Sequence, residues 1–326
     1  MRSFEHVTVQ TVDEACALLR DSGGRAKLNA GGTDLLSLLR SDAAPRYPDL
    51  LINIKAISGL DYIIEEAGTL KIGALARLAD VSRSSLLNAR YGVLARAAHS
   101  VAAPQIRNMA TLGGNLCQEV RCWYYRYPAH IGGPISCLRK GSGTCLAIKG
   151  DNRYHAILGA RKCFAVCPSD TAVALTALDA ALVIAGAKGE RSLTVPDFYH
   201  SLGNHLADDE MVREIEMPMR PSAGQQIFSK YTVRKPIDFA IVSVAVVLTL
   251  EETICTDARI VLGAVGPAPF RATAAEAMLI GRPISQQIAT QAAEAALTGA
   301  KPLSKNGYKI EIAKTLIQRA IMGEAP

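Results

Sequence analysis

Cysteines are the residues whose type and spacing most clearly indicate chemistry in this chain. Six of the eight cysteines in the 326 residues lie between Asn115 and Asp170, a stretch that also contains the only tryptophan. The first residues lack the apolar core of a signal peptide, and the longest apolar run, residues 239–250, is far shorter than the roughly 20 residues that span a bilayer. We therefore expect a cytoplasmic protein without a membrane span, in which thiols stay reduced and indicate a metal site before a disulfide.

The spacing of these cysteines suits a loop that wraps around an object larger than a single ion. Zinc favours closely spaced C-x2–4-C pairs, whereas a cubane iron–sulfur cluster takes four thiolates from separated points. Eight Lys and Arg residues lie between residues 121 and 162 against one acidic residue, which indicates an anionic group nearby. Zinc bound by four thiolates is also anionic, so charge does not decide between the two. The available ligands are Cys117, Cys122, Cys137, Cys145, Cys163 and Cys167, with His130 and His155 in reserve.

Two glycine pairs form the second feature that could do chemistry. In "NAGGTDLL", residues 29–36, the glycines separate an expected strand from a helix capped by Thr33 or Asp34. Such a turn exposes backbone N–H groups that suit a phosphate, although a plain structural turn is the alternative. "ATLGGNL", residues 110–116, is a second turn of this kind, and two such turns can hold two ends of a diphosphate. Neither matches the Rossmann or Walker pattern.

The elements that must position these residues are of mixed type. A capping box, Thr11 with Glu14, predicts a helix over residues 11–21, and helical spacing predicts another over residues 79–88. From residue 214 to residue 266 four strands follow one another with short turns, which suggests one antiparallel sheet. The tail from Ala272 onward reads as helical. The predicted class is therefore α+β.

Five stretches occur in the order seen in a known protein family. They are "AGGTDLL", "QIRNMATLGGNL", "PSDTAVALTALDA", "FSKYTVRKPIDFAIVSVAVVL" and "ARIVLGAVGPAPFRATAAE". Over nearly its whole length the chain thus resembles the FAD-binding (medium) subunits of the xanthine dehydrogenase family of molybdenum hydroxylases. The resemblance implies an FAD-binding fold of the vanillyl-alcohol-oxidase type, with two N-terminal subdomains, residues 1–57 and 58–178. A C-terminal antiparallel sheet-and-helix domain, residues 179–326, would follow.

The resemblance also implies which residues hold FAD between the two subdomains. The two glycine turns would form two pyrophosphate loops, and Asp170 would lie near the ribose or adenine end. Lys230 would lie close to the isoalloxazine, a solvated strand lysine being the alternative. The implied cofactor-binding residues are Leu28, Asn29, Ala30, Gly31, Gly32, Thr33, Asp34, Leu35, Ile106, Thr111, Gly113, Gly114, Asn115, Asp170 and Lys230.

The cysteine-rich segment, at about residues 117–168, is an insertion between "GGN" and "PSD", which lie much closer together in ordinary members of the family. Its "RCWYYR", "SCLRKGSGTC", "GDNRYHAI" and "KCFAVCPSD" resemble the flavin subunit (beta-subunit) of 4-hydroxybenzoyl-CoA reductase and related subunits of aldehyde oxidoreductases. The resemblance implies a [4Fe–4S] cluster. The reductase pattern has a cysteine near the place where Tyr154 and His155 stand in this chain. The fourth ligand must therefore come from elsewhere, and Cys167 and His155 are the alternatives to Cys163. The expected ligands are Cys122, Cys137, Cys145 and Cys163.

These expectations describe an electron-transfer subunit with no catalytic residue of its own. Electrons would pass between [2Fe–2S] centres on a partner, FAD and the [4Fe–4S] cluster, which faces a carrier such as ferredoxin. The expected partners are a large molybdopterin-binding subunit and a small subunit with two [2Fe–2S] centres, in a dimer of heterotrimers. The enzyme would be of the 4-hydroxybenzoyl-CoA reductase type or of the xanthine or aldehyde dehydrogenase type. A stand-alone flavoprotein with a structural zinc is the alternative from another class, and we expect no nucleic-acid binding.

Overall fold

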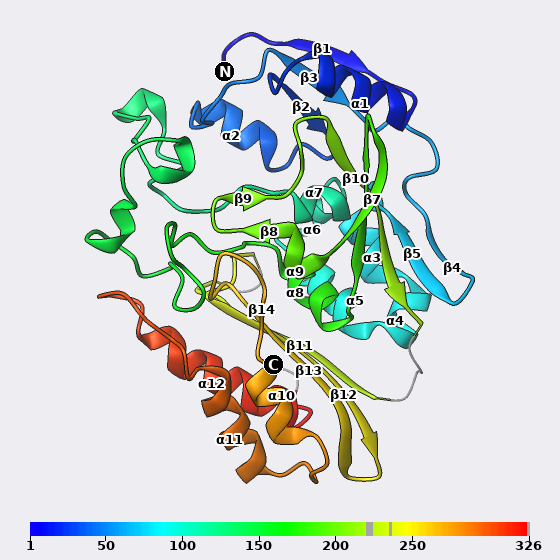
Figure 1. Cartoon of the computed structure of the whole chain (residues 1–326), viewed down its shortest axis with the longest axis vertical. Helices are drawn as coiled ribbons and strands as arrows, with labels where there is room; N and C mark the ends of the chain where they lie inside the picture. Colours follow the sequence, from blue (N-terminus) through cyan, green and yellow to red (C-terminus); the bar gives the residue numbers. More distant parts are fainter. Residues whose placement is uncertain (220–223, 235–236, 325–326) are drawn as a thin grey trace.

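The computed structural model describes residues 1–219, 224–234 and 237–324. Within these residues the chain forms three main sheets, which follow one another from the N-terminal to the C-terminal end of the molecule (Figure 1). Helices accompany each sheet, and the last sheet pairs antiparallel throughout. The predicted α+β class, with a C-terminal antiparallel sheet-and-helix domain, is confirmed.

The first subdomain is a small parallel sheet with two helices. Its central strand β3 pairs in parallel with β1 on one side and β2 on the other. The Thr11 hydroxyl accepts a hydrogen bond from the Glu14 N–H, and the Glu14 carboxylate accepts one from the Thr11 N–H, so the predicted capping box is confirmed. The elements are β1 (Glu5–Thr8), α1 (Val12–Asp21), β2 (Ala26–Asn29), α2 (Leu35–Ser41) and β3 (Leu50–Asn53).

The second sheet has five antiparallel strands in the order β4-β5-β10-β6-β7. Strand β10 pairs with both β5 and β6, so residues 210–218 complete this sheet. The sequence had led us to expect them in one sheet with the later strands. This pairing favours a domain boundary near residue 220 over the one at residues 178/179. The strands are β4 (Ile63–Glu66), β5 (Thr69–Gly73), β6 (Ala181–Gly186), β7 (Gly189–Thr194) and β10 (Glu210–Pro218).

Short helices surround this sheet, and the most central is α8, in which every residue is buried. The helix expected over residues 79–88 is two helices, because Ser84 adopts an extended ψ of 121° and its hydroxyl caps the second by accepting from the Leu87 N–H. A two-stranded hairpin, β8 (Tyr199–His200) with β9 (Gly203–Asn204), follows α9. The helices are α3 (Leu78–Arg83), α4 (Ser85–Arg90), α5 (Gly92–His99), α6 (Pro104–Arg107), α7 (Leu112–Leu116), α8 (Asp170–Ala177) and α9 (Val195–Phe198).

The C-terminal domain packs three helices on a four-stranded antiparallel sheet (Figure 1). Buried alanines on α11, among them Ala289, Ala292 and Ala293, let the helices approach closely. None of the helices in residues 1–219, 224–234 and 237–324 is long and apolar enough to cross a bilayer. The elements are β11 (Gln225–Tyr231), β12 (Val242–Glu251), β13 (Ile254–Gly263), β14 (Phe270–Arg271), α10 (Thr273–Leu279), α11 (Gln286–Ala296) and α12 (Tyr308–Ile321).

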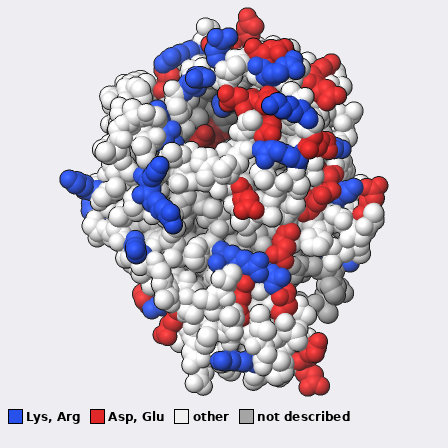
Figure 2. All heavy atoms as spheres, in the orientation of Figure 1, with Lys and Arg blue, Asp and Glu red and all other residues white. Residues whose placement is uncertain are grey.

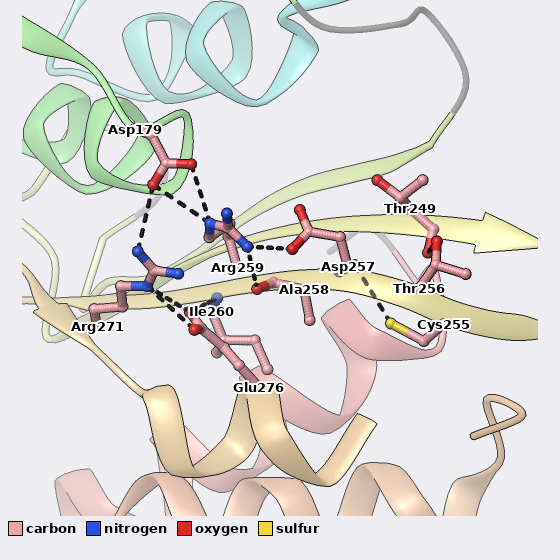
Figure 3. Close-up of polar contacts among 10 residues, drawn as sticks. All are labelled: Asp179, Thr249, Cys255, Thr256, Asp257, Ala258, Arg259, Ile260, Arg271 and Glu276. Atoms are coloured by element: carbon pink, nitrogen blue, oxygen red, sulfur yellow. Dashed lines mark hydrogen bonds and ion pairs between the residues drawn. The ribbon is translucent and has the colours of Figure 1, made fainter. Parts of the chain in front are cut away.

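A chain of ion pairs joins this domain to the rest of the molecule (Figure 3). Asp179, directly after α8 and its C-cap, accepts from Arg259 Nε on β13 at 3.1 Å and from Arg271 on β14 at 3.4 Å. Arg271 in turn donates to the buried Glu276 of α10 at 3.0 Å. Glu276 also accepts from the Ile260 N–H at 3.0 Å. The network therefore ties the end of α8 in the FAD-binding part to two strands, β13 and β14, and to helix α10 of the C-terminal domain.

The insertion, residues 117–168, contains neither an α-helix nor a β-strand and lies at the left of Figure 1. Loops of this length are uncommon in compact domains unless they serve a function or are disordered. Here a small core that includes Val120, Tyr125, Cys137 and Cys163 holds the segment together and packs it against Leu38 of helix α2. Its regular structure is three 3-10 turns, Ala129–Ile131, Leu138–Lys140 and Leu146–Ile148.

Candidate functional site

A large cavity of about 850 Å³ lies where the first subdomain, the second subdomain and strand β11 meet. This volume falls in the range of small-molecule and cofactor sites. Figure 2 shows a hollow in the upper part of the drawn face, with acidic and basic side chains around it. The cavity is lined by every residue expected to bind the cofactor: Leu28, Asn29, Ala30, Gly31, Gly32, Thr33, Asp34, Leu35, Ile106, Thr111, Gly113, Gly114, Asn115, Asp170 and Lys230.

The first glycine turn, residues 31–34, presents unpaired donors to this cavity. In the described part of the chain, the backbone N–H groups of Gly31, Gly32, Thr33 and Asp34 have no protein acceptor. A Cβ on Gly31 would lie 2.0 Å from the Met109 carbonyl oxygen, and Gly32 has a φ of 70°, so both positions require glycine. The turn is thus built to bring free N–H groups close to an anion, which fits the diphosphate of FAD.

The second glycine turn differs from the expectation, because "LGGNL" forms the short helix α7. Its N–H groups are already used: Gly113 donates to the Ala74 carbonyl, and Gly114 donates to the Thr111 hydroxyl, which caps the helix. Asn115 Oδ1 accepts from the hydroxyls of Ser169 and Thr171 at 2.6 and 2.7 Å. The turn shapes the cavity wall and holds the two ends of the insertion together, while the first turn offers the free N–H groups.

Asp34 does not cap helix α2, since its side chain makes no capping hydrogen bond. Its carboxylate instead accepts from the Glu119 N–H at 2.8 Å, from Arg126 Nη2 at 2.7 Å and from Arg121. Burial raises the pKa of the Asp34 carboxyl, but Arg121 and Arg126 outweigh burial and hold the pKa below its ordinary value. An ionised carboxylate at the end of the first glycine turn therefore anchors the start of the insertion.

Asp170 and Lys230 form a buried ion pair on the cavity wall. Lys230 Nζ donates to Asp170 Oδ2 at 2.7 Å and to the Ser100 carbonyl at 3.0 Å, and the two side chains are 8% and 6% exposed. The alternative of a solvated strand lysine is therefore wrong. Because the two groups touch, they cannot mark opposite ends of an extended cofactor, as the sequence-based roles required. The pair instead links α8 to β11 at one place beside the cavity.

The four expected cluster ligands surround a second, small cavity of about 20 Å³ inside the insertion. Tyr125 and Leu138 also line it, so its wall is largely apolar. Burial, with smaller contributions from the nearby Cys163 and Cys145, raises the pKa of the Cys122 thiol to about 11. His155 Nε2 lies 3.3 Å from Cys122 Sγ. The thiols that the structure brings together are those of Cys122, Cys137, Cys145 and Cys163.

The two other cysteines of the insertion and Trp123 lie outside the small cavity. Cys167 is buried in the core of the second subdomain, and Cys117 lines the large cavity. Trp123 packs edge-on against Tyr154 and His155 at ring-centroid distances of 5.6 and 5.8 Å. Such edge-on packing holds these three rings together within the insertion.

Buried donors without acceptors gather on the insertion. Among the described residues, six buried side-chain atoms lack a hydrogen-bond partner, and four of them belong to the insertion. Arg139, whose neighbour in sequence is Lys140, lines the small cavity, and Lys140 lies near Cys137 and Cys122. An unpaired buried donor costs free energy, so these groups indicate an anionic partner. The four atoms are Arg121 Nε, Arg139 Nε, Lys140 Nζ and His155 Nδ1.

Two arginines of the flavin cavity were missed by the sequence reasoning. Arg121 and Arg126 line the large cavity, although we had counted them only as basic neighbours of the cysteines. The hairpin β8–β9 also borders the cavity through His200 and Asn204. The arginines could have been suspected because Arg121 follows "GGN" by only six residues. The hairpin carries no motif that points to a ligand.

Comparisons with known proteins assign the chain to a class. Residues 2–220 match the family described as the FAD binding domain in molybdopterin dehydrogenase. Residues 228–323 match the carbon monoxide dehydrogenase flavoprotein C-terminal domain. These matches, together with the cavity, define an FAD-binding flavoprotein of the molybdopterin dehydrogenase class.

Individual relatives cover the chain from end to end. It is 35% identical over its whole length to the aldehyde oxidoreductase FAD-binding subunit PaoB of Escherichia coli K12, and the match covers 99% of that protein. The carbon monoxide dehydrogenase medium chain of Hydrogenophaga pseudoflava is 28% identical over 98% of the chain and 96% of its own length. A solved structure of carbon monoxide dehydrogenase from that organism, lacking the Mo-pyranopterin moiety, superimposes with a TM-score of 0.79, covering 99% of this chain and 97% of the other at 28% identity.

The chain therefore belongs to the FAD-binding medium subunits of the xanthine dehydrogenase and carbon monoxide dehydrogenase family of molybdenum hydroxylases. It is the FAD-binding subunit of a multi-subunit oxidoreductase. The predicted FAD-binding fold, followed by a C-terminal sheet domain, is confirmed.

Proposed function

We propose that this chain is an electron-relay subunit in which the insertion holds a [4Fe–4S] cluster beside the flavin. Bound FAD exchanges electrons in pairs or singly, which suits a junction between a two-electron reaction and iron–sulfur centres. The observation that carries the proposal is the placement of four cysteines around one cavity, with Cys122 directly after Arg121 of the flavin cavity.

The donor set around the small cavity fits such a cluster. Four thiols are available, and the unpaired donors of Arg139 and Lys140 would compensate its negative charge and stabilise the reduced form. Among the described residues, no group of three or more His, Cys, Asp or Glu side chains is placed to hold a metal ion. A cubane gives each thiolate a different iron, so its ligands stand farther apart than those of zinc. Iron and zinc analysis therefore decides between the cluster and a structural zinc.

For the fourth ligand we propose Cys163 and not Cys167 or His155. Cys163 shares the cavity with the three other thiols, whereas Cys167 lies in the core of the second subdomain. His155 contacts Cys122 Sγ through Nε2, which is the position of a hydrogen-bonding neighbour of a ligand. Its other ring nitrogen is unpaired.

We further propose two partner subunits, a large molybdopterin-binding one and a small one with two [2Fe–2S] centres, assembled as a dimer of heterotrimers. The medium-chain relatives support this assembly, because a medium chain implies other chains. Electrons would pass between the small subunit, the flavin site and the cluster, and from there to a carrier such as ferredoxin. The proposed location is the cytoplasm.

The identity to an aldehyde oxidoreductase subunit supports an aldehyde-oxidising enzyme as the complex. A 4-hydroxybenzoyl-CoA reductase type or a xanthine dehydrogenase type stands beside it, because the organic substrate binds outside this chain. The relative named as a xanthine dehydrogenase FAD-binding subunit is 25% identical over 95% of the chain.

Metal analysis of the anaerobically purified full chain tests the cluster. We expect flavin together with about four irons and acid-labile sulfide per chain, since a cubane binds four thiolates. Single changes of Cys122, Cys137, Cys145 and Cys163 to Ser should each abolish the cluster and its visible absorption. Cys167→Ser serves as the matched control, because this cysteine is in the same insertion but outside the cavity.

Two results would contradict the proposal. If the chain contains one zinc ion and no iron, the insertion holds a structural zinc and not a cluster. Loss of iron in Cys167→Ser with retention in Cys163→Ser would move the fourth ligand. Co-purification of the chain with two other subunits tests the assembly, and a monomer with full catalytic activity contradicts a relay role.

A further inference from the structure

We infer that the insertion supplies part of the flavin site: Arg121 is a phosphate-binding residue for FAD, held in place by Asp34 and Arg126. The first glycine turn and the start of the insertion are 87 residues apart in sequence, yet Arg121 donates to the carboxylate of Asp34. Both side chains line the large cavity. The arginine therefore lies on the same cavity wall as the free N–H groups of residues 31–34, which can bind an anion.

The guanidinium of Arg121 is only partly satisfied by protein. Of its five N–H groups, one donates to Asp34 and one to Gln118 Oε1 at 2.8 Å, while Nε is buried without an acceptor. Its side chain is 23% exposed, and burial lowers its pKa, opposed by Asp34. The group remains a cation with spare donors, which matches the geometry of phosphate oxygens.

The face of the guanidinium is covered by an aromatic ring. Arg121 Cζ lies 4.5 Å from the centre of the Phe239 ring, and Phe239 also lines the cavity. A ring on one face and a carboxylate at one edge fix the plane of the arginine, so its free edge keeps one orientation. Preorganised donors lose less entropy on binding, which increases their contribution to affinity.

Arg126 has a different task from Arg121. It donates to the carbonyls of Val120 and Glu119 at 2.7 and 3.2 Å as well as to Asp34 at 2.7 Å. It thereby fixes the backbone on the N-terminal side of Cys122. The two guanidiniums offset the negative charge of Asp34, which alone would repel a phosphate.

One consequence follows for the insertion. Arg121 precedes Cys122, and the Arg126 N–H donates to the Cys122 carbonyl at 3.0 Å. Ordering of the cysteine loop and ordering of the phosphate site therefore involve the same backbone. Binding at the two sites should be thermodynamically linked, and linkage is reciprocal. This consequence rests on the proposed cluster, whereas the role of Arg121 does not.

The test is a binding titration of the deflavinated full chain, with FAD, ADP and riboflavin as probes. In Arg121→Gln we expect about tenfold to hundredfold weaker binding of FAD and of ADP, the usual loss of one charge-assisted hydrogen bond. Riboflavin, which has no phosphate, should bind as it does to the unchanged chain. Arg161→Gln is the matched control, since Arg161 is an exposed arginine of the same insertion outside both cavities.

Unchanged FAD binding in Arg121→Gln overturns the inference, and so does weaker FAD binding with unchanged ADP binding, which would place the arginine at the flavin ring. Equal losses for all three probes together with a lower melting temperature would show a merely structural role. Arg121→Lys guards against that confusion, because it keeps the charge and should retain an intermediate affinity for ADP.

The linkage is tested separately. Iron removal by a chelator should weaken FAD binding in the unchanged chain but not in Arg121→Gln, where the connection is already broken. FAD affinity independent of iron content contradicts the linkage. A chain that never contains iron contradicts the proposed cluster. The role of Arg121 is still tested in that case, because the ADP titration of Arg121→Gln does not depend on iron.

Discussion

At the residue scale, the flavin cavity depends on a position where only glycine fits. The backbone of Gly31 touches the Met109 carbonyl so closely that any Cβ must displace one of the two segments. Met109 belongs to the loop before α7, so the contact holds the first glycine turn against the second. A Cβ atom added at Gly31 would therefore push the two glycine turns that line the cavity apart.

We expect Gly31→Ala to bind FAD at least about tenfold more weakly and to lose about 2 kcal/mol of stability through overpacking. Flavin titration and urea unfolding measure the two effects. Gly299→Ala is the matched control, since no heavy atom lies within 4 Å of the Cβ that it would add. Equal behaviour of the two variants would show that the contact between the turn and Met109 is not required.

At the element scale, helix α12 holds the insertion through a buried lysine. Lys309, in the first turn of α12, is fully buried, and its Nζ donates to the carbonyls of His155 and Ala264. The side-chain amide of Asn306 donates to the carbonyls of His155 and Ala156. A segment without strands thus obtains backbone partners from a C-terminal helix.

Burial lowers the pKa of Lys309 to about 7, well below the value of about 10.4 for an exposed lysine. The folded chain then binds this proton less tightly than the unfolded chain. Burying the charged lysine lowers the free energy of unfolding most below pH 7. This penalty declines as the pH rises to about 10, because the lysine then loses its proton in the unfolded chain as well. The difference in the free energy of unfolding between Lys309→Met and the unchanged chain should therefore vary between pH 7 and 10.

Urea unfolding at several pH values between 6 and 10 measures this difference. The stability of Lys309→Met relative to the unchanged chain should fall as the pH rises through that window. Lys314→Met, a partly exposed lysine on the same helix, is the control and should give a flatter comparison. A pH-independent difference for Lys309→Met would mean that Lys309 titrates alike in the folded and unfolded chains.

At the scale of the whole molecule, the cavity is closed by contacts between parts that are distant in sequence. The Asp170–Lys230 pair joins the start of α8 in the FAD-binding part to β11 of the C-terminal domain, and the Asp179 network joins the same two parts beyond the other end of α8. Exposed ion pairs contribute little, but removal of one partner of a buried pair leaves an uncompensated charge.

Lys230→Met should accordingly destabilise the chain by about 3–5 kcal/mol, because Asp170 would be left buried without its partner. The double variant Asp170→Asn with Lys230→Met should recover part of this loss. Arg234→Met removes an exposed partner of Asp238 and is the control, with little effect expected. Chemical unfolding of the three variants decides, and a loss for Lys230→Met no larger than that of the control would argue against a buried ion pair.

Local signals in the sequence determined much of the fold and of the candidate site. The Thr11 capping box, the first glycine turn and the apolar run of β12 are short-range patterns, and each forms where it was expected. The ordered motifs led to an FAD-binding subunit. The family resemblance selected fifteen residues that all line one cavity, and the resemblance of the insertion selected four cysteines that line another.

Only the tertiary structure decided how these parts meet. The pairing of β10 with β5, of Asp34 with Arg121 and of Asp170 with Lys230 joins residues separated by 60 to more than 100 positions. Nothing in the local pattern of Asp34 distinguishes a helix cap from an anchor for two arginines. Its role depends on which cations the folded chain places within hydrogen-bonding distance, and long-range packing determines that.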